Sequence, residues 1–280
     1  MRSYAKLVSD TRRLLKPLAW KLRRGNAVSR IGFILGSQRS GTNMLNDAFD
    51  RDWYCMAFGE DHGLALGPSY EHDLRWRWRP LDEVSAVFQT CRSPLIIAKP
   101  IVESQRALEL LEYFADSRII WAYRHYLDVA QSSIALFGEE ASLHNLSAVL
   151  DPTRRTHWFS QELSDETRAV VKRYFDPDRP LPDLKALGWF VRNSLFFQFG
   201  LDRNPRVTMS NYETLVRDPV TEMRRLYSFL EADFPGPHVC SHMHQSSVRK
   251  GSHIQVSSDV DGLCQRVLKR LDDAYSRIAR

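Results

Sequence analysis

The chain has 280 residues, 43% of them hydrophobic, and a formal net charge of +5. This length and apolar content suffice for one domain with a buried core, and the small excess of positive charge suits an anionic ligand without indicating a nucleic-acid partner. The four cysteines are widely spaced and form no CxxC pair, which argues against a disulfide framework or a zinc ribbon and favours a reducing compartment.

Residues 1–30 form a basic, amphipathic segment that we expect to be helical, with an interruption near Pro17. Its apolar positions recur at helical spacing among basic residues: Leu7, Thr11, Leu14, Leu15, Leu18 and Leu22 among Arg12, Arg13, Lys16, Lys21, Arg23 and Arg24. We favour packing against the protein's own domain, and peripheral contact with an anionic membrane surface is the alternative. No apolar run reaches about 18 residues and no secretory leader is present, so we expect a cytoplasmic protein.

Strands are predicted at four short apolar runs rich in branched residues, 31–35, 95–98, 118–123 and 206–210. Helical patterns at 42–49, 128–137 and 219–230 follow three of them. This alternation predicts a single α/β domain over 31–280, a P-loop-like, three-layer fold in which helices flank a central parallel sheet. Regions 52–92 and 139–183 break the alternation, and we expect them to be inserts that form the walls or lid of an acceptor site.

The loop GSQRSGTN lies between the first predicted strand and the helical pattern that follows it. Gly36 and Gly41 stand five residues apart, as in the P-loop motif, so backbone N–H groups at the helix start can bind an anion. Thr42 and Asn43 occupy the places of the motif's lysine and hydroxyl residue, and the positive charge stands at Arg39 instead. The loop is therefore predicted to bind an anion less charged than a nucleoside triphosphate, without a metal ion. A glycine-rich turn without a ligand is the alternative.

A second anion site is predicted where the strand at 118–123 ends. Arg124 follows this strand directly, and Ser132 lies in the next predicted helix. An arginine at the carboxyl end of a strand, with a hydroxyl group nearby, can hold a phosphate through two hydrogen bonds.

The segments GSQRSGT, LIIAKPIVESQRALELLEYFADSRIIWAYRHYLDVAQSS, YETLVRDPVTEMRRLYSFL and SSVRKGS together resemble the sulfotransferases that use 3′-phosphoadenosine 5′-phosphosulfate, over residues 31–252. The resemblance implies that this compound is the donor and that no metal ion takes part. It also assigns donor-binding residues. The 5′-phosphosulfate loop would comprise Ser37, Gln38, Arg39, Ser40, Gly41, Thr42 and Asn43, and the 3′-phosphate site Arg124, Ser132, Arg249, Lys250 and Gly251.

The same resemblance implies catalytic roles at the site of transfer. Lys99 falls where many members have a lysine near the bridging oxygen, and Arg39 would help to stabilise the charge of the transferred group. Members that act on small phenols and steroids have a base histidine two residues beyond this lysine, and Ile101 stands there. That base is therefore missing from this chain.

Carbohydrate-acting and some bacterial members use a glutamate shortly beyond the phosphosulfate loop. This favours Glu60 as the catalytic base, followed by His62 and Asp61, with Glu103 as a further candidate. A surface turn with solvated charges is an equally good interpretation of any one of the first three. The helical motif GWFVRNSLFF contains Trp189 and Asn193, which match a pattern of the family and suit the core as well as a site.

Two further motifs carry weaker signals. Cys240, His242 and His244 alternate in CSHMHQ, but no fourth ligand is evident nearby, so we do not expect a metal site. In LRWRWRP, tryptophans that could stack on a sugar alternate with arginines that could meet an anionic acceptor, and simple packing explains the run equally well.

The function predicted from the sequence is transfer of a sulfuryl group to a hydroxyl or amine of a small-molecule or glycan acceptor. The loop form and the missing histidine favour a carbohydrate or a carbohydrate-bearing metabolite. Two alternatives belong to other classes: a P-loop phosphotransferase or nucleotide hydrolase with a degenerate loop, and a non-catalytic binder of anionic glycan or nucleic acid. No recognisable nucleic-acid motif supports the last one.

Overall fold

A five-stranded parallel sheet forms the centre of the protein, with strand order β2-β3-β1-β4-β5. The computed structural model describes residues 11–12, 14–18, 20, 29–60, 63–67, 74–244 and 250–279. The strands are β1 (Arg30–Gly36), β2 (Cys55–Phe58), β3 (Leu95–Ala98), β4 (Arg118–Tyr123) and β5 (Val207–Asn211). Because they are parallel, all five carboxyl ends lie at one edge of the sheet, where the predicted loop and Arg124 both stand.

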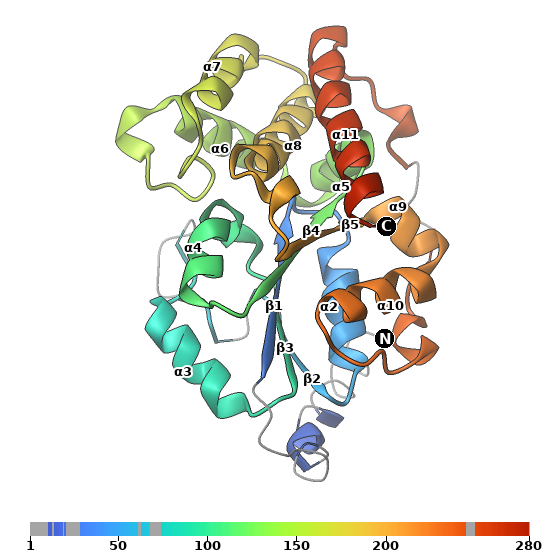
Figure 1. Ribbon diagram of the computed structural model, residues 1–280. Coiled ribbons are helices and arrows are strands. Elements are labelled where there is room, and N and C mark those ends of the chain that lie inside the picture. The colour runs from blue at the N-terminus through green and yellow to red at the C-terminus, as the bar shows by residue number, and fades with distance from the viewer. Residues whose placement is uncertain are drawn as a thin grey trace.

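Helices cover both faces of this sheet (Figure 1). The α-helices are α2 (Thr42–Arg51), α3 (Leu81–Cys91), α4 (Ala107–Tyr113), α5 (Tyr126–Phe137), α6 (Glu140–Leu150), α7 (Asp165–Tyr174), α8 (Leu181–Gln198), α9 (Tyr212–Arg217), α10 (Pro219–Phe229) and α11 (Ser258–Ile278). Short 3₁₀ helices are η1 (Ile101–Arg106), η2 (Pro152–Arg154), η3 (Leu201–Arg203), η4 (Pro237–Cys240) and η5 (Lys250–His253). In Figure 1, α6, α7 and α8 gather beyond the carboxyl ends of the strands.

The two faces of the sheet pack into two separate apolar clusters. Successive residues of a strand point to opposite faces, so Phe33 and Leu35 of β1 join one cluster and Ile34 joins the other. The first cluster includes residues of α3, α4, α8 and α11, and the second includes residues of α2, α9 and α10. The predicted three-layer α/β fold with a parallel sheet is thus confirmed.

The four predicted strands are present, each within one or two residues of its expected bounds. The sequence analysis did not predict β2, which lies inside region 52–92 and forms one edge of the sheet by pairing with β3. That region also supplies α3, whose Val84 and Phe88 pack in the first cluster. Part of the expected insert therefore belongs to the central scaffold.

The described part of the N-terminal segment contacts the domain through polar groups. The buried Lys16 Nζ donates hydrogen bonds to the carbonyl oxygens of Asp50 and Cys55, both at 2.7 Å, and Trp20 Nε1 donates to the carbonyl oxygen of Trp53 at 2.8 Å. The leucines at 14, 15 and 18 face away and are 79%, 44% and 58% exposed. The segment thus packs on its own domain by the side opposite to its leucines, and membrane contact stays a prediction. In the part of the chain that the structure describes, no helix is both long and apolar enough to span a membrane.

Candidate active site

The glycine loop lies at the carboxyl end of β1, where two of its residues must be glycine. Gly36 has φ 124°, and a Cβ there would lie 2.2 Å from the carbonyl oxygen of Ala122 in β4. Gly41 has φ 81°, and a Cβ there would lie 2.5 Å from the ring of Tyr212. Gly41 is the N-cap of α2 and has no side chain with which to cap the first turn of that helix. Its N–H groups are thus available to an anion.

Ser40 adds an unsatisfied polar group to this loop. Its side chain is buried, and its Oγ has no hydrogen-bond partner among the described residues. A buried hydroxyl without a partner is costly, and an anionic oxygen bound at the helix start would satisfy it. This observation fits the phosphosulfate-binding role that the resemblance implies for the loop.

Three predicted donor-binding residues from different parts of the chain meet beside the loop. Arg39 has φ 65°, and its Nε donates a hydrogen bond of 2.9 Å to Ser132 Oγ in α5. Arg124 Nη1 lies 3.5 Å from the carbonyl oxygen of Arg39. Burial, followed by the nearby positive charge of Arg124, lowers the pKa of Arg39. Two neighbouring guanidinium groups at the carboxyl edge of the sheet form a site of positive potential that suits an anion with more than one phosphate.

Arg124 is held in place by its own set of contacts. Its Nη2 donates to Asp128 Oδ2 at 3.1 Å, and its guanidinium lies 4.1 Å from the centre of the Tyr212 ring. Asp128 Oδ1 accepts a hydrogen bond of 2.8 Å from the backbone N–H of Gly251. A Cβ at Gly251 would lie 2.3 Å from the backbone of Leu127, so only glycine allows this close approach. The C-terminal element therefore reaches the predicted 3′-phosphate site.

Two of the predicted residues of this element fall outside what the structure describes. The structure does not describe Arg249, and it describes only the backbone of Lys250. Thr42, by contrast, is buried at the start of α2, and Asn43 faces the cavity described below.

Lys99 and Glu60 form an ion pair at the ends of two neighbouring strands. Lys99 follows β3 and Glu60 lies two residues beyond the end of β2, and the Lys99 Nζ to Glu60 Oε2 distance is 2.8 Å. The backbone N–H of Lys99 also donates to the carbonyl oxygen of Phe58 at 2.9 Å. The Lys99 side chain is buried, whereas Glu60 lines the cavity. The alternative bases Asp61 and His62 lie outside the described residues.

Glu103, the further candidate base, has a different environment. Its side chain is completely buried, accepts hydrogen bonds from Arg77 and from the Trp78 backbone N–H, and forms an ion pair with Arg106 at 3.1 Å. A carboxylate held in this way stabilises the packing of region 74–79 against η1. Because its oxygens are already bound, Glu103 is not available as a base. Of the arginines in LRWRWRP, Arg77 is turned inward into this ion pair with Glu103.

A cavity of about 900 Å³ opens beside the loop. One end is lined by Ser37, Gln38, Arg39, Asn43 and Glu60. The remaining wall comes from 75–76, Val102, α5, α6, 158–159 and α8. Both regions that were expected to be inserts thus contribute to the wall.

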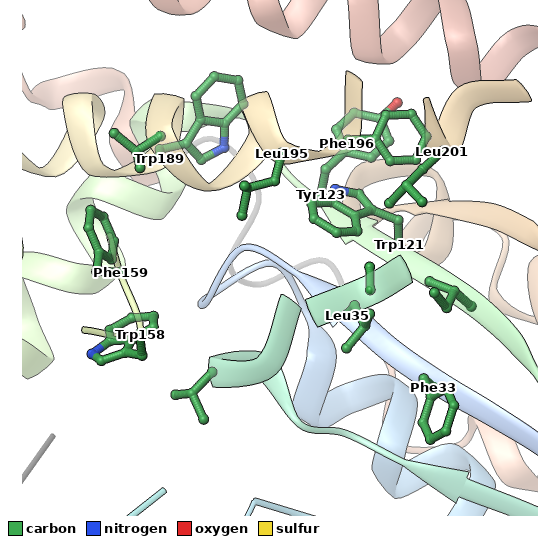
Figure 2. Close-up of a cluster of buried hydrophobic side chains, with 14 of the residues drawn as sticks. Phe33, Leu35, Trp121, Tyr123, Trp158, Phe159, Trp189, Leu195, Phe196 and Leu201 are labelled. Atoms are coloured by element: carbon green, nitrogen blue, oxygen red, sulfur yellow. The ribbon is translucent and has the colours of Figure 1, made fainter. Parts of the chain in front are cut away.

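Aromatic rings form much of this wall. Figure 2 shows the rings of Trp158 and Phe159 below Trp189 of α8, at one end of the buried cluster that also holds Phe33 and Trp121. Trp189 lines the cavity and donates from Nε1 to the carbonyl oxygen of Arg124 at 2.9 Å, so it connects the wall to the anion site. Asn193 is buried, and its Nδ2 donates a hydrogen bond to the carbonyl oxygen of Trp189. Asn193 therefore belongs to the core of the protein.

Several wall residues were not anticipated from the sequence. They include Trp158, Phe159, Lys185 and Arg192. A signal was present for Arg192, because it lies in the same GWFVRNSLFF motif as Trp189. No local pattern marks Trp158 or Phe159, which lie in a segment between helices.

Two residues of the CSHMHQ motif contact backbone carbonyl groups. His242 Nε2 lies 3.0 Å from the carbonyl oxygen of Met44, and Cys240 Sγ lies 3.5 Å from that of Pro219. Within the described residues, no group of three or more His, Cys, Asp or Glu side chains is placed to hold a metal ion.

Solved structures with this fold include two sulfotransferase domains. The sulfotransferase domain of the olefin synthase of Synechococcus PCC 7002 is 16% identical, with a TM-score of 0.56 over 89% of this chain and 96% of that one. The sulfotransferase domain from the curacin biosynthetic pathway is 17% identical, with a TM-score of 0.57 over 88% of this chain and 99% of that one. No family model and no curated protein matches the sequence. The chain therefore has the fold of sulfotransferase domains, as the sequence resemblance implied.

Proposed function

We propose that this protein, which has the fold of sulfotransferase domains, is a sulfotransferase that uses 3′-phosphoadenosine 5′-phosphosulfate and transfers its sulfuryl group to a hydroxyl or amine of an acceptor. The observation that carries the proposal is the meeting of Arg39, Arg124 and Ser132 beside the uncapped start of α2. A donor of this kind has two separate anionic groups, and the site offers a separate set of partners for each.

The proposed binding mode assigns the loop to the 5′-phosphosulfate. Backbone N–H groups at the start of α2, the Ser40 hydroxyl and Arg39 would hold its oxygens. Arg124 and Ser132 would hold the 3′-phosphate, with Gly251 bringing the C-terminal element within reach. Although Ser132 Oγ accepts a hydrogen bond from Arg39, its own O–H remains free to donate to a phosphate oxygen.

The proposed chemistry is a direct, in-line transfer. The acceptor oxygen forms a bond to sulfur as the bond between sulfur and the bridging oxygen breaks, and the electron pair of that bond goes to the leaving phosphate. Glu60 accepts the acceptor proton, since its carboxylate lines the cavity next to the loop. Lys99 has three N–H donors, so it can hold Glu60 while another donor stabilises charge on the bridging oxygen.

A carbohydrate or carbohydrate-bearing acceptor stays a prediction. The aromatic wall with Trp76, Trp158 and Trp189 would support stacking on a sugar. The phosphotransferase alternative gains no support from the geometry. The loop has neither the lysine nor the magnesium-binding hydroxyl of a triphosphate site, and the buried Lys99 is held by Glu60.

Calorimetric titration with 3′,5′-adenosine bisphosphate, compared with Mg-ATP, tests the proposal. We expect tight binding of the bisphosphate, weak binding of ATP, and a loss of about 1.5 to 3 kcal/mol in Arg124→Ala, as for hydrogen bonds to a charged group. Arg203→Ala is the matched control because Arg203 is highly exposed and distant in sequence from the loop. Circular dichroism melting checks that both variants fold. Preference for Mg-ATP, or equal affinity of Arg124→Ala and wild type for the bisphosphate, would contradict the proposal.

A further inference from the structure

The wall of the cavity combines apolar residues with buried positive charge. Val102, Leu146, Trp158, Phe159 and Trp189 supply the apolar part. Lys185 and Arg192 line the same cavity from α8, together with Gly188 and Trp189. Positions 185, 188, 189 and 192 share one face of an α-helix, so this face is presented to whatever occupies the cavity.

Arg192 is the more deeply buried of the two cations, at 3% exposure. Its hydrogen-bond partners are neutral: Nη2 donates to the carbonyl oxygen of Ile101 at 3.1 Å and to Gln105 Oε1 at 3.3 Å, and Nη1 lies 3.5 Å from the carbonyl oxygen of Trp158. The rings of Trp158 and Phe159 lie 5.1 and 5.8 Å from its guanidinium carbon. Its Nε has no acceptor among the described residues.

No carboxylate neutralises this guanidinium within the described part of the chain. Glu103, the acid that acts on it electrostatically, is already bound by Arg77, Arg106 and the Trp78 backbone. Burial, followed by the charge of Arg77, lowers the pKa of Arg192 to about 9, and the side chain stays charged at neutral pH. A buried charge without a counter-ion costs several kcal/mol, and an anion entering the cavity would offset that cost.

The position of Arg192 relates it to the site of transfer. It contacts Ile101, which lies two residues beyond Lys99, and Val102 next to Ile101 lines the cavity. Glu60, the proposed base, lines the cavity at the loop end. Glu60 and Arg192 thus line one cavity, so a ligand with its hydroxyl at Glu60 could present a second group to Arg192.

We propose that the acceptor is an amphiphilic anion, with an apolar body, a hydroxyl that receives the sulfuryl group, and an acidic group that binds Arg192. This inference rests on the proposed function, since it names the substrate class of the same site. It separates the expected acceptor from a neutral sugar, which would leave Arg192 without a counter-ion.

Binding of three matched probes tests the inference without any turnover. The probes are 12-hydroxydodecanoate, its methyl ester and 1,12-dodecanediol, each titrated while the fluorescence of the cavity tryptophans is followed, with 3′,5′-adenosine bisphosphate present. We expect the wild type to bind the acid at least about tenfold more tightly than the ester or the diol. Arg192→Met should bind all three alike, and Arg192→Lys should retain part of the preference because it keeps the charge.

The outcomes separate this inference from the proposed function. Equal binding of acid, ester and diol by wild type would overturn the inference, and it would do so even if Arg192→Met failed to fold. Loss of the preference in Lys185→Met but not in Arg192→Met would also overturn it, because the anion would then bind two helical turns away. Failure to bind the bisphosphate would instead overturn the proposed function. Melting temperature and bisphosphate affinity confirm that each variant is folded.

Discussion

The Nζ of Lys99 lies 2.8 Å from Oε2 of Glu60, although the two residues are 39 positions apart in the chain. The sheet brings them together, because β2 and β3 pair in parallel with Phe58 opposite Ala98. Each of the two residues follows the end of its strand. The proposed base and the proposed cation for the leaving group are thus positioned by the scaffold rather than by a flexible loop.

The first prediction concerns catalysis by this pair. Glu60→Gln removes the proton acceptor while keeping the shape of the side chain, so we expect the turnover number for sulfuryl transfer to fall by about 10² to 10⁴. Affinity for the bisphosphate should change little, because Glu60 is not among the proposed donor-binding residues. Single-turnover rates and calorimetry measure the two effects separately.

Glu83→Gln is the matched control, since Glu83 is an exposed carboxylate on α3. It should leave both the rate and the affinity unchanged. If Glu60→Gln keeps the wild-type rate, the base is another residue, and the undescribed His62 and Asp61 become the first candidates.

The second prediction concerns the loop. In Gly41→Ala the new Cβ would collide with the Tyr212 ring at a φ of 81°, and that ring packs on Arg124. We therefore expect a loss of bisphosphate affinity of at least about tenfold, together with a lower melting temperature, because both anion sites would be disturbed. Calorimetry and thermal melting measure these effects.

Gly262→Ala provides the contrast within the same protein. Gly262 lies inside α11, and a Cβ there would be 3.7 Å from the flexible end of Arg266. This change should stabilise the protein by about 0.5 to 1 kcal/mol and leave bisphosphate affinity intact. If Gly41→Ala and Gly262→Ala had the same bisphosphate affinity and the same melting temperature, the geometry of the loop would not be critical.

The sequence predicted four of the five strands because each is a short run rich in apolar and β-branched residues. It did not predict β2 because CMAF is short and contains no β-branched residue. Without β2 the sheet order could not be derived, and the contact between Lys99 and Glu60 could not be derived either. The glycine loop and the Arg124 site were recognisable because their residues lie at element ends, where local spacing carries information.

The wall of the cavity was less predictable. Helix α8 is apolar on most of its surface and largely buried, so no periodic pattern distinguishes the side of Lys185 and Arg192 from the opposite side. Which side faces a cavity depends on how α5, α6 and α8 pack together. This packing is tertiary structure, which the local sequence pattern of α8 does not reveal. The same holds for Lys16: the sequence shows it only as one of the basic residues of the amphipathic segment, whereas backbone carbonyl groups at 50 and 55 bind it in the interior.

The third prediction concerns the N-terminal segment. Lys16→Met removes a charged donor from the carbonyl oxygens of Asp50 and Cys55, so we expect the free energy of unfolding to fall by about 1.5 to 3 kcal/mol. Leu14→Ser and Leu18→Ser should each change it by less than about 0.5 kcal/mol, because these leucines are exposed. Chemical denaturation measures all three variants. Greater destabilisation by the leucine changes than by Lys16→Met would mean that the segment packs with its leucines inward.

The last prediction concerns Lys185 and pH. Burial lowers the pKa of Lys185 from 10.5 to about 8, with Glu139 opposing the shift. Between about pH 8 and 10.5 the unfolded chain therefore holds more protons on this residue than the folded chain does, and stability due to Lys185 rises with pH. Relative to Lys185→Met, the wild type should gain about 1 to 2 kcal/mol of unfolding free energy between pH 7.5 and 9.5.

Lys172→Met is the control, because Lys172 is an exposed lysine on α7. The difference in unfolding free energy between the wild type and this variant should not vary with pH over the same window. Urea denaturation of the three proteins at several pH values measures the difference, and an equally flat result for Lys185→Met would show that Lys185 keeps an ordinary pKa.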